Sequence, residues 1–143
     1  MRYFTFILFS ALTYSVFAQP NQITKIEFQS TSRTYFEQIT ITPYHSIITQ
    51  KLNREAKATT QKQIITSDNW SKLINKLEKT SPKQWPKLVS PSQKRTYDGA
   101  RHSQLVAYTT TTSYTHLFDD LQPNTELCNL LSLILEIRDS SKK

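Results

Sequence analysis

Hydrophobic and polar residues alternate along the first half of the chain, in segments rich in β-branched side chains. Between Gln38 and Thr42 the alternation places Ile39 and Ile41 on one face and the threonines on the other. A period of two predicts β-strands, because successive side chains of a strand point to opposite faces. The strands predicted on this basis are residues 23–28, 38–42, 46–52 and 59–66.

A helical period replaces the alternation at Ser67, which we expect to be the N-cap, with Asp68 in the first turn. Apolar residues then recur at the spacing of one helix face, up to the stop signal at Pro82. These residues are Trp70, Leu73, Ile74 and Leu77.

The segment from Pro82 to Ala100 is irregular, but Trp85, Leu88 and Val89 predict that it packs on the core rather than acting as a free linker. Strand character returns over residues 102–109 and 113–118, which we expect to pair as an antiparallel hairpin. In the first of these strands, Leu105 and Ala107 should face opposite to Val106 and Tyr108.

A second helix is predicted to begin at the cap residue Asn124 and to continue to Ile137. Its apolar positions cover so much of the circumference that the helix should be well buried, and with it the thiol of Cys128. We interpret the pair Asp119-Asp120 as helix-capping residues rather than as calcium ligands, because no EF-hand spacing surrounds it.

The order of these elements predicts an α+β fold of the type ββββ-α-ββ-α. Short connections favour a mainly antiparallel sheet of about six strands, with the two helices packed on one face. We expect residues 19–143 to form a single domain of this kind.

Residues 1–18 have the three-part pattern of a secretory signal peptide. A positive start at Arg2 precedes an apolar run from Tyr3 to Leu12, and small residues lead to Ala18, after which we expect cleavage. The run is too short for a transmembrane anchor. The sequence therefore predicts an exported protein, periplasmic or extracellular, with no membrane anchor after cleavage.

Composition excludes several classes of site. The 143 residues include one Cys and one Gly, so no intramolecular disulfide and no glycine-rich phosphate loop can form. The three His residues have no companions at ligand spacing, and we expect neither a metal nor another cofactor. An exported protein without a disulfide framework is more typical of a bacterial envelope than of a eukaryotic secretory route.

The formal net charge of +7 is concentrated in the middle of the chain, where residues 67–101 carry eight basic and three acidic side chains. A row of lysines that includes Lys72, Lys76 and Lys83 could bind an acidic protein, a glycan or a lipid headgroup. Export argues against nucleic acid as the partner. The simpler alternative is that these lysines only keep an exposed helix soluble.

A second candidate is the cluster from Arg95 to His102, which also contains Asp98 and Arg101. The arginines could bind an anion or a carboxylate, and His102 could act as an acid or base oriented by Asp98. The simpler interpretation is a loop that enters a strand, with Asp98 capping the turn and the arginines in water.

Together with the leader, three segments resemble small exported bacterial proteins of uncharacterised function: Trp70 to Leu77, Lys94 to Ala100 and Phe118 to Ile137. The resemblance implies export and an α+β domain, and it brings no catalytic residues. We therefore expect a non-enzymatic module that binds another macromolecule through its basic face. The alternative is a small envelope hydrolase or anion-binding protein that uses the Arg95–His102 cluster.

Overall fold

The computed structural model describes residues 22–96 and 100–140. Within these residues the chain forms six strands, two α-helices and three short 3₁₀ helices. The strands are β1 (Ile23–Thr31), β2 (Phe36–Ile41), β3 (His45–Lys51), β4 (Thr59–Ile64), β5 (His102–Thr109) and β6 (Ser113–Asp119). The helices are α1 (Ser67–Lys79), η1 (Pro82–Lys87), η2 (Lys94–Thr96), η3 (Thr125–Leu127) and α2 (Cys128–Ser140).

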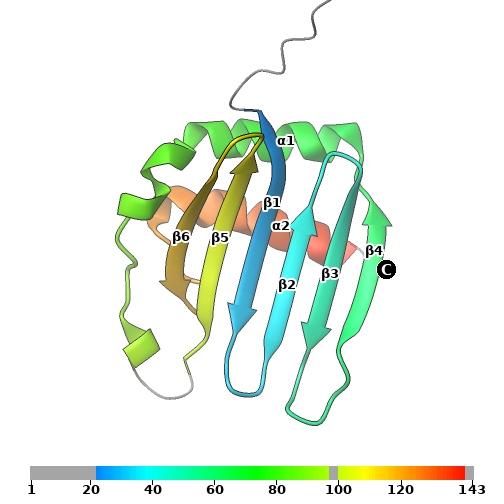
Figure 1. Cartoon of the computed structure of the whole chain (residues 1–143), viewed down its shortest axis with the longest axis vertical. Helices are drawn as coiled ribbons and strands as arrows, with labels where there is room; N and C mark the ends of the chain where they lie inside the picture. Colours follow the sequence, from blue (N-terminus) through cyan, green and yellow to red (C-terminus); the bar gives the residue numbers. More distant parts are fainter. Residues whose placement is uncertain (1–21, 97–99, 141–143) are drawn as a thin grey trace, which may run out of the picture.

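All six strands belong to one antiparallel sheet with the order β4-β3-β2-β1-β5-β6 (Figure 1). The first four strands follow one another as a meander. The chain then crosses over through α1 and η1, and β5 pairs with β1 in the middle of the sheet. The predicted ββββ-α-ββ-α order and the α+β class are confirmed.

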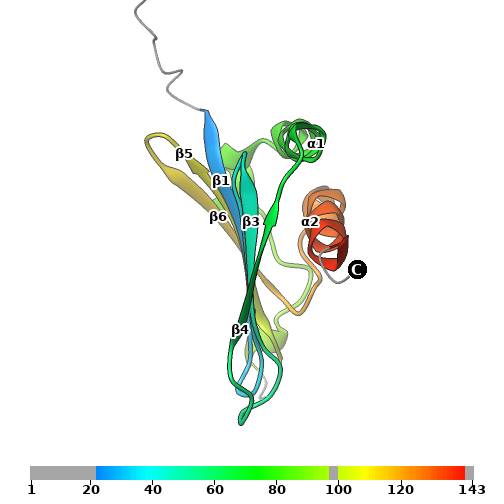
Figure 2. The same cartoon turned by 90° about the vertical axis from the view of Figure 1, so that its right-hand side faces the viewer.

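Both α-helices lie on the same face of the sheet, and no helix of the described residues lies over the opposite face (Figure 2). The core fills the space between the sheet and the helices. Cross-strand pairs such as Phe28 and Ile39 are completely buried there, against Leu73 and Leu77 of α1. The alternation in β2 and the helical period in α1 therefore point toward the same core, as the sequence predicted.

The segment after α1 packs on this core through Trp85, which is completely buried. Its indole Nε1 donates a hydrogen bond of 2.9 Å to Oγ1 of Thr80, the residue that ends α1. Leu88 also packs against the core, but Val89 is 76% exposed, contrary to the prediction for that residue. Val89 follows the C-cap residue of η1, Leu88, and lies outside any helix or strand.

The structure corrects three local predictions, on the N-cap of α1, on Asp119-Asp120 and on Cys128, and refines a fourth, on Asn124. The N-cap of α1 is Thr66 instead of Ser67, because the Thr66 hydroxyl accepts a hydrogen bond from the backbone N–H of Asn69. Asn124 caps η3, which leads directly into α2. Asp119 and Asp120 cap no helix, since both end the β-hairpin and pair with basic residues. Cys128 is exposed, because it stands at the first turn of α2 on the side away from the core.

A buried ion pair ties the end of α2 to the sheet. Glu37 of β2 is 1% exposed at its side chain, and its two carboxylate oxygens accept hydrogen bonds of 3.1 and 3.2 Å from Nη1 of Arg138. The same carboxylate accepts a hydrogen bond from the Tyr35 hydroxyl and one from the amide of Gln50. The paired residues are 101 positions apart in the chain.

The predicted signal peptide, residues 1–18, lies outside the described residues, as does Asp98. In the described part of the chain, no helix is both long enough and apolar enough to cross a membrane.

Candidate binding face

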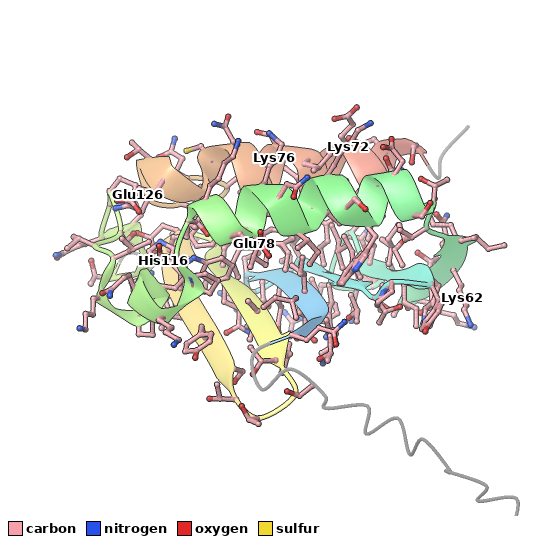
Figure 3. All side chains as sticks on the ribbon, turned by 90° about the horizontal axis from the view of Figure 1, so that it is seen from above. Lys62, Lys72, Lys76, Glu78, His116 and Glu126 are labelled. Carbon is pink, nitrogen blue, oxygen red and sulfur yellow. The ribbon has the colours of Figure 1, made fainter. Side chains whose placement is uncertain are left out.

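Helix α1 presents its lysines on the side opposite the core. Leu73 and Leu77 anchor the helix, and Lys72 and Lys76 point outward from it, along the side that faces α2 (Figure 3). Because the inner face of the helix holds it in place, the outer face can differ in charge without disturbing the packing.

The lysines of this region differ in how they are paired. Nζ of Lys72 lies 2.6 Å from a carboxylate oxygen of Asp68, one helical turn earlier, and this hydrogen bond and charge raise the pKa of Lys72. Among the residues that the structure describes, no acidic side chain forms an ion pair with Lys76 or Lys83, nor with Lys79 or Lys87. We use the name lysine face for the set Lys72, Lys76, Lys79, Lys83 and Lys87.

A groove of about 540 Å³, which the sequence did not predict, borders the lysine face at Lys83. The groove lies between α1, the start of β1 and the β5–β6 hairpin. Its walls include Trp70, Tyr114 and Ile23, and Lys83 and Glu78 supply opposite charges. No local pattern could have indicated it, because three separate parts of the chain form its walls.

The Arg95–His102 cluster is organised around a residue outside it, Asp119 at the end of β6. Nε of Arg95 donates a 3.0 Å hydrogen bond to one Asp119 oxygen, and the Ser92 hydroxyl donates one of 2.7 Å to the other. Burial by itself would raise the pKa of Asp119, but the hydrogen bond from Ser92 and the charge of Arg95 outweigh it and lower the pKa. The side chain of Asp119 is 1% exposed, so Arg95 serves to compensate a buried charge.

The other described members of the cluster turn to different neighbours. The guanidinium of Arg101 stacks over the ring of Tyr35, with its Cζ 3.9 Å from the ring centroid. His102 is exposed at the start of β5, directly across from Asp119 in the register of the hairpin. The expectation that both arginines extend into water is wrong for Arg95, and Asp98 lies outside the described residues.

Arg95 and Arg101, the two described arginines of the cluster, thus contact different partners. A shallow hollow of about 290 Å³ beside Arg95 is lined by Ser92, Thr96 and Leu117, among others.

A buried histidine belongs to the structural framework instead of to a site. His116 of β6 is 1% exposed, and its Nε2 accepts a hydrogen bond of 3.2 Å from the backbone N–H of Asn124. Burial lowers the pKa of His116, although a hydrogen bond with the backbone of Trp85 acts in the opposite direction. The ring thus links β6 to η1 and to the start of η3.

Across residues 22–96 and 100–140, no group of His, Cys, Asp or Glu side chains is arranged to hold a metal ion. Comparison with known proteins adds no family, since no protein-family model matches the chain and no curated protein is significantly similar to it.

Proposed function

We propose that this protein is an exported, non-enzymatic module that binds an anionic macromolecule through the lysine face. The observation that carries the proposal is that Lys76 and Lys79 of α1 and Lys83 and Lys87 of η1 form no ion pair with an acidic side chain among the described residues, while the inner side of α1 is fixed in the core. Unpaired cations on one face produce a local positive potential, which attracts and orients an anionic partner. Export is supported by the pattern of residues 1–18 alone.

Lys76 and Lys83 contribute more to this face than Lys72, because neither forms an ion pair within the described residues. Lys72 contributes less to the positive potential, because its Nζ already forms an ion pair with Asp68. Since the lysines are spread along α1 and η1, we expect a partner with a broad anionic surface rather than a single small anion.

Charge reversal tests the proposal. In the triple variant Lys72→Glu, Lys76→Glu and Lys83→Glu, we expect affinity for the anionic partner to fall by at least about tenfold, and binding to weaken as salt is added. The probes are vesicles containing phosphatidylglycerol, a sulfated glycan such as heparin, and a folded acidic protein, each titrated separately. The probe that binds identifies the class of partner.

A matched control separates the position of the charges from their number. The single variant Arg33→Glu changes the net charge as much as Lys76→Glu does, on the β1–β2 turn, away from both α1 and β4. It should retain binding within about twofold, because exposed charges more than a Debye length away are largely screened. Equal losses in Lys76→Glu and Arg33→Glu, or no binding of any probe, would refute the proposal.

Processing is tested independently of binding. The chain recovered from a bacterial envelope should have the mass of residues 19–143, and a recovered chain that still contains residues 1–18 would contradict export by this route.

A further inference from the structure

The two edges of the sheet differ in how they are covered. Beside β6, the segment that contains η1 packs along the strand (Figure 1). At the other edge, β4 pairs with β3 on one side, and no described element pairs with its other side. An uncovered edge strand presents unpaired backbone donors and acceptors, which another strand can complete.

The ladder between β3 and β4 identifies which groups are unpaired. The backbone N–H of Ile65 donates a 3.2 Å hydrogen bond to the carbonyl of Tyr44, immediately after the pair His45–Ile64. Backbone groups alternate in direction along an antiparallel strand, so those of Gln61 and Gln63 also point toward β3. The N–H and C=O groups of Thr60, Lys62 and Ile64 therefore point outward.

The side chains of Thr60, Lys62 and Ile64 share the face of the sheet opposite the core. Thr60 and Lys62 are exposed, and Ile64 is 88% exposed. On the core face, the side-chain amide of Gln63 donates a hydrogen bond to the carbonyl of Ile137 in α2.

The charge around this edge selects the occupant. Residues 51–62 carry four basic side chains and one acidic one, and the basic residues are Lys51, Arg54, Lys57 and Lys62. A second copy of the chain would place these positive charges against its own, which is the usual effect of lysine on an edge strand. An acidic segment would instead gain from the same charges.

We propose that β4 binds an extended acidic segment of another protein as a seventh strand of the sheet. The outward N–H and C=O groups of Thr60, Lys62 and Ile64 supply the main-chain hydrogen bonds, and Lys62 with the neighbouring basic residues supplies the charge preference. This surface shares no residue with the lysine face, so it goes beyond the function proposed above, and each proposal can fail without the other.

The probe is a fluorescein-labelled peptide with alternating Glu and Val residues, and its binding is measured by fluorescence anisotropy. Two control peptides share its length. One carries N-methyl groups on every residue, which removes the backbone donors of both edges, and the other has Lys in place of Glu. We expect binding of the acidic peptide alone. Equal binding of the N-methylated peptide would overturn the strand-addition mode.

A pair of variants at one position tests the backbone contact. Thr60→Pro removes an outward N–H without removing a bond to β3, and Thr60→Ala controls for loss of the hydrogen bond between the Thr60 and Thr49 hydroxyls. We expect affinity to fall about tenfold in Thr60→Pro and to stay within about twofold in Thr60→Ala. Equal affinity in both variants would contradict the proposal.

Charge and backbone protection provide readouts that do not depend on the proline variant folding. Lys62→Glu should weaken binding several-fold, whereas Arg33→Glu, an equal charge change on the β1–β2 turn, should not. In hydrogen exchange of the wild-type chain, the peptide should protect the amides of Thr60, Lys62 and Ile64, while those of Gln61 and Gln63 are already protected. Protection elsewhere but not at these three amides, or self-association of the chain instead of peptide binding, would overturn the proposal.

Discussion

Replacing Arg138 by methionine tests how the end of α2 is held on the sheet. The substitution keeps most of the apolar stem and removes the cation that compensates Glu37. Glu37 is 1% exposed and Arg138 16% exposed at their side chains, so the carboxylate would stay buried without its partner. Breaking a buried ion pair by removing one partner typically costs about 3–5 kcal/mol.

The lower end of this range applies here. Glu37 keeps hydrogen bonds from Tyr35 and from Gln50, which continue to solvate the carboxylate. Part of Arg138 is accessible, so water can replace some of the lost interaction. We therefore expect Arg138→Met to lower the free energy of unfolding by about 3 kcal/mol, a large part of the roughly 5–15 kcal/mol of a typical domain.

Equilibrium unfolding in urea measures this loss. The midpoint should fall while the slope with denaturant stays unchanged, because the native state buries nearly the same surface. The exposed pair of Lys72 with Asp68 is the matched control, and Lys72→Met should cause no measurable loss. The double variant Glu37→Gln with Arg138→Met should recover part of the stability, since it removes the uncompensated charge. If Arg138→Met were no more destabilising than Lys72→Met, or if the double variant were less stable than Arg138→Met, the reasoning would be refuted.

Three further predictions concern buried side chains. Trp85→Ala should cost about 3–5 kcal/mol in urea unfolding, because Trp85 is completely buried, and a loss below 1 kcal/mol would show that η1 does not belong to the core. Burial and the hydrogen bond to Glu37 raise the pKa of Tyr35 from 10.0 to about 12, so the unfolded chain releases this proton first and stability should fall as the pH rises from about 10 to 12. Tyr35→Phe should reduce that fall relative to wild type in thermal unfolding, and an identical pH profile would contradict the assignment. The pKa of His116 is lowered by burial, so the unfolded chain binds a proton more readily and stability should fall as the pH drops through about 6.5; His116→Gln should flatten the profile there, and an unchanged slope would contradict it.

Local periodicity was sufficient to predict the elements and their order. The alternation around Ile39 and Ile41 and the apolar face from Trp70 to Leu77 each record which side of one element is buried. These patterns repeat within a few residues, so they can be detected without knowledge of the partner. They placed both helices and all six strands, although the N-cap of α1 was assigned one residue late.

Charged residues were harder to interpret, because the sequence does not show what faces them. Asp119 was taken for a helix cap, but it is a buried acid bound to Arg95 and Ser92. The sequence indicated Arg95 as a candidate binding residue but gave no sign of its partner Asp119, which lies at the end of β6, 24 positions away. The lysine face was visible in the sequence as a row of basic residues, whereas the lack of acidic partners for Lys76 and Lys83 became evident only in three dimensions.

The sequence by itself determined the class of the fold, the order of its elements and the composition that rules out disulfides and glycine-rich loops. The tertiary structure alone decided that β5 inserts beside β1, that Glu37 meets Arg138, and that no strand among the described residues pairs with the outer edge of β4. The physical reason is the separation along the sequence of the residues involved. The pattern of buried residues within a few positions predicts a strand or a helix. Pairing between distant segments depends on how all the elements pack together in the core.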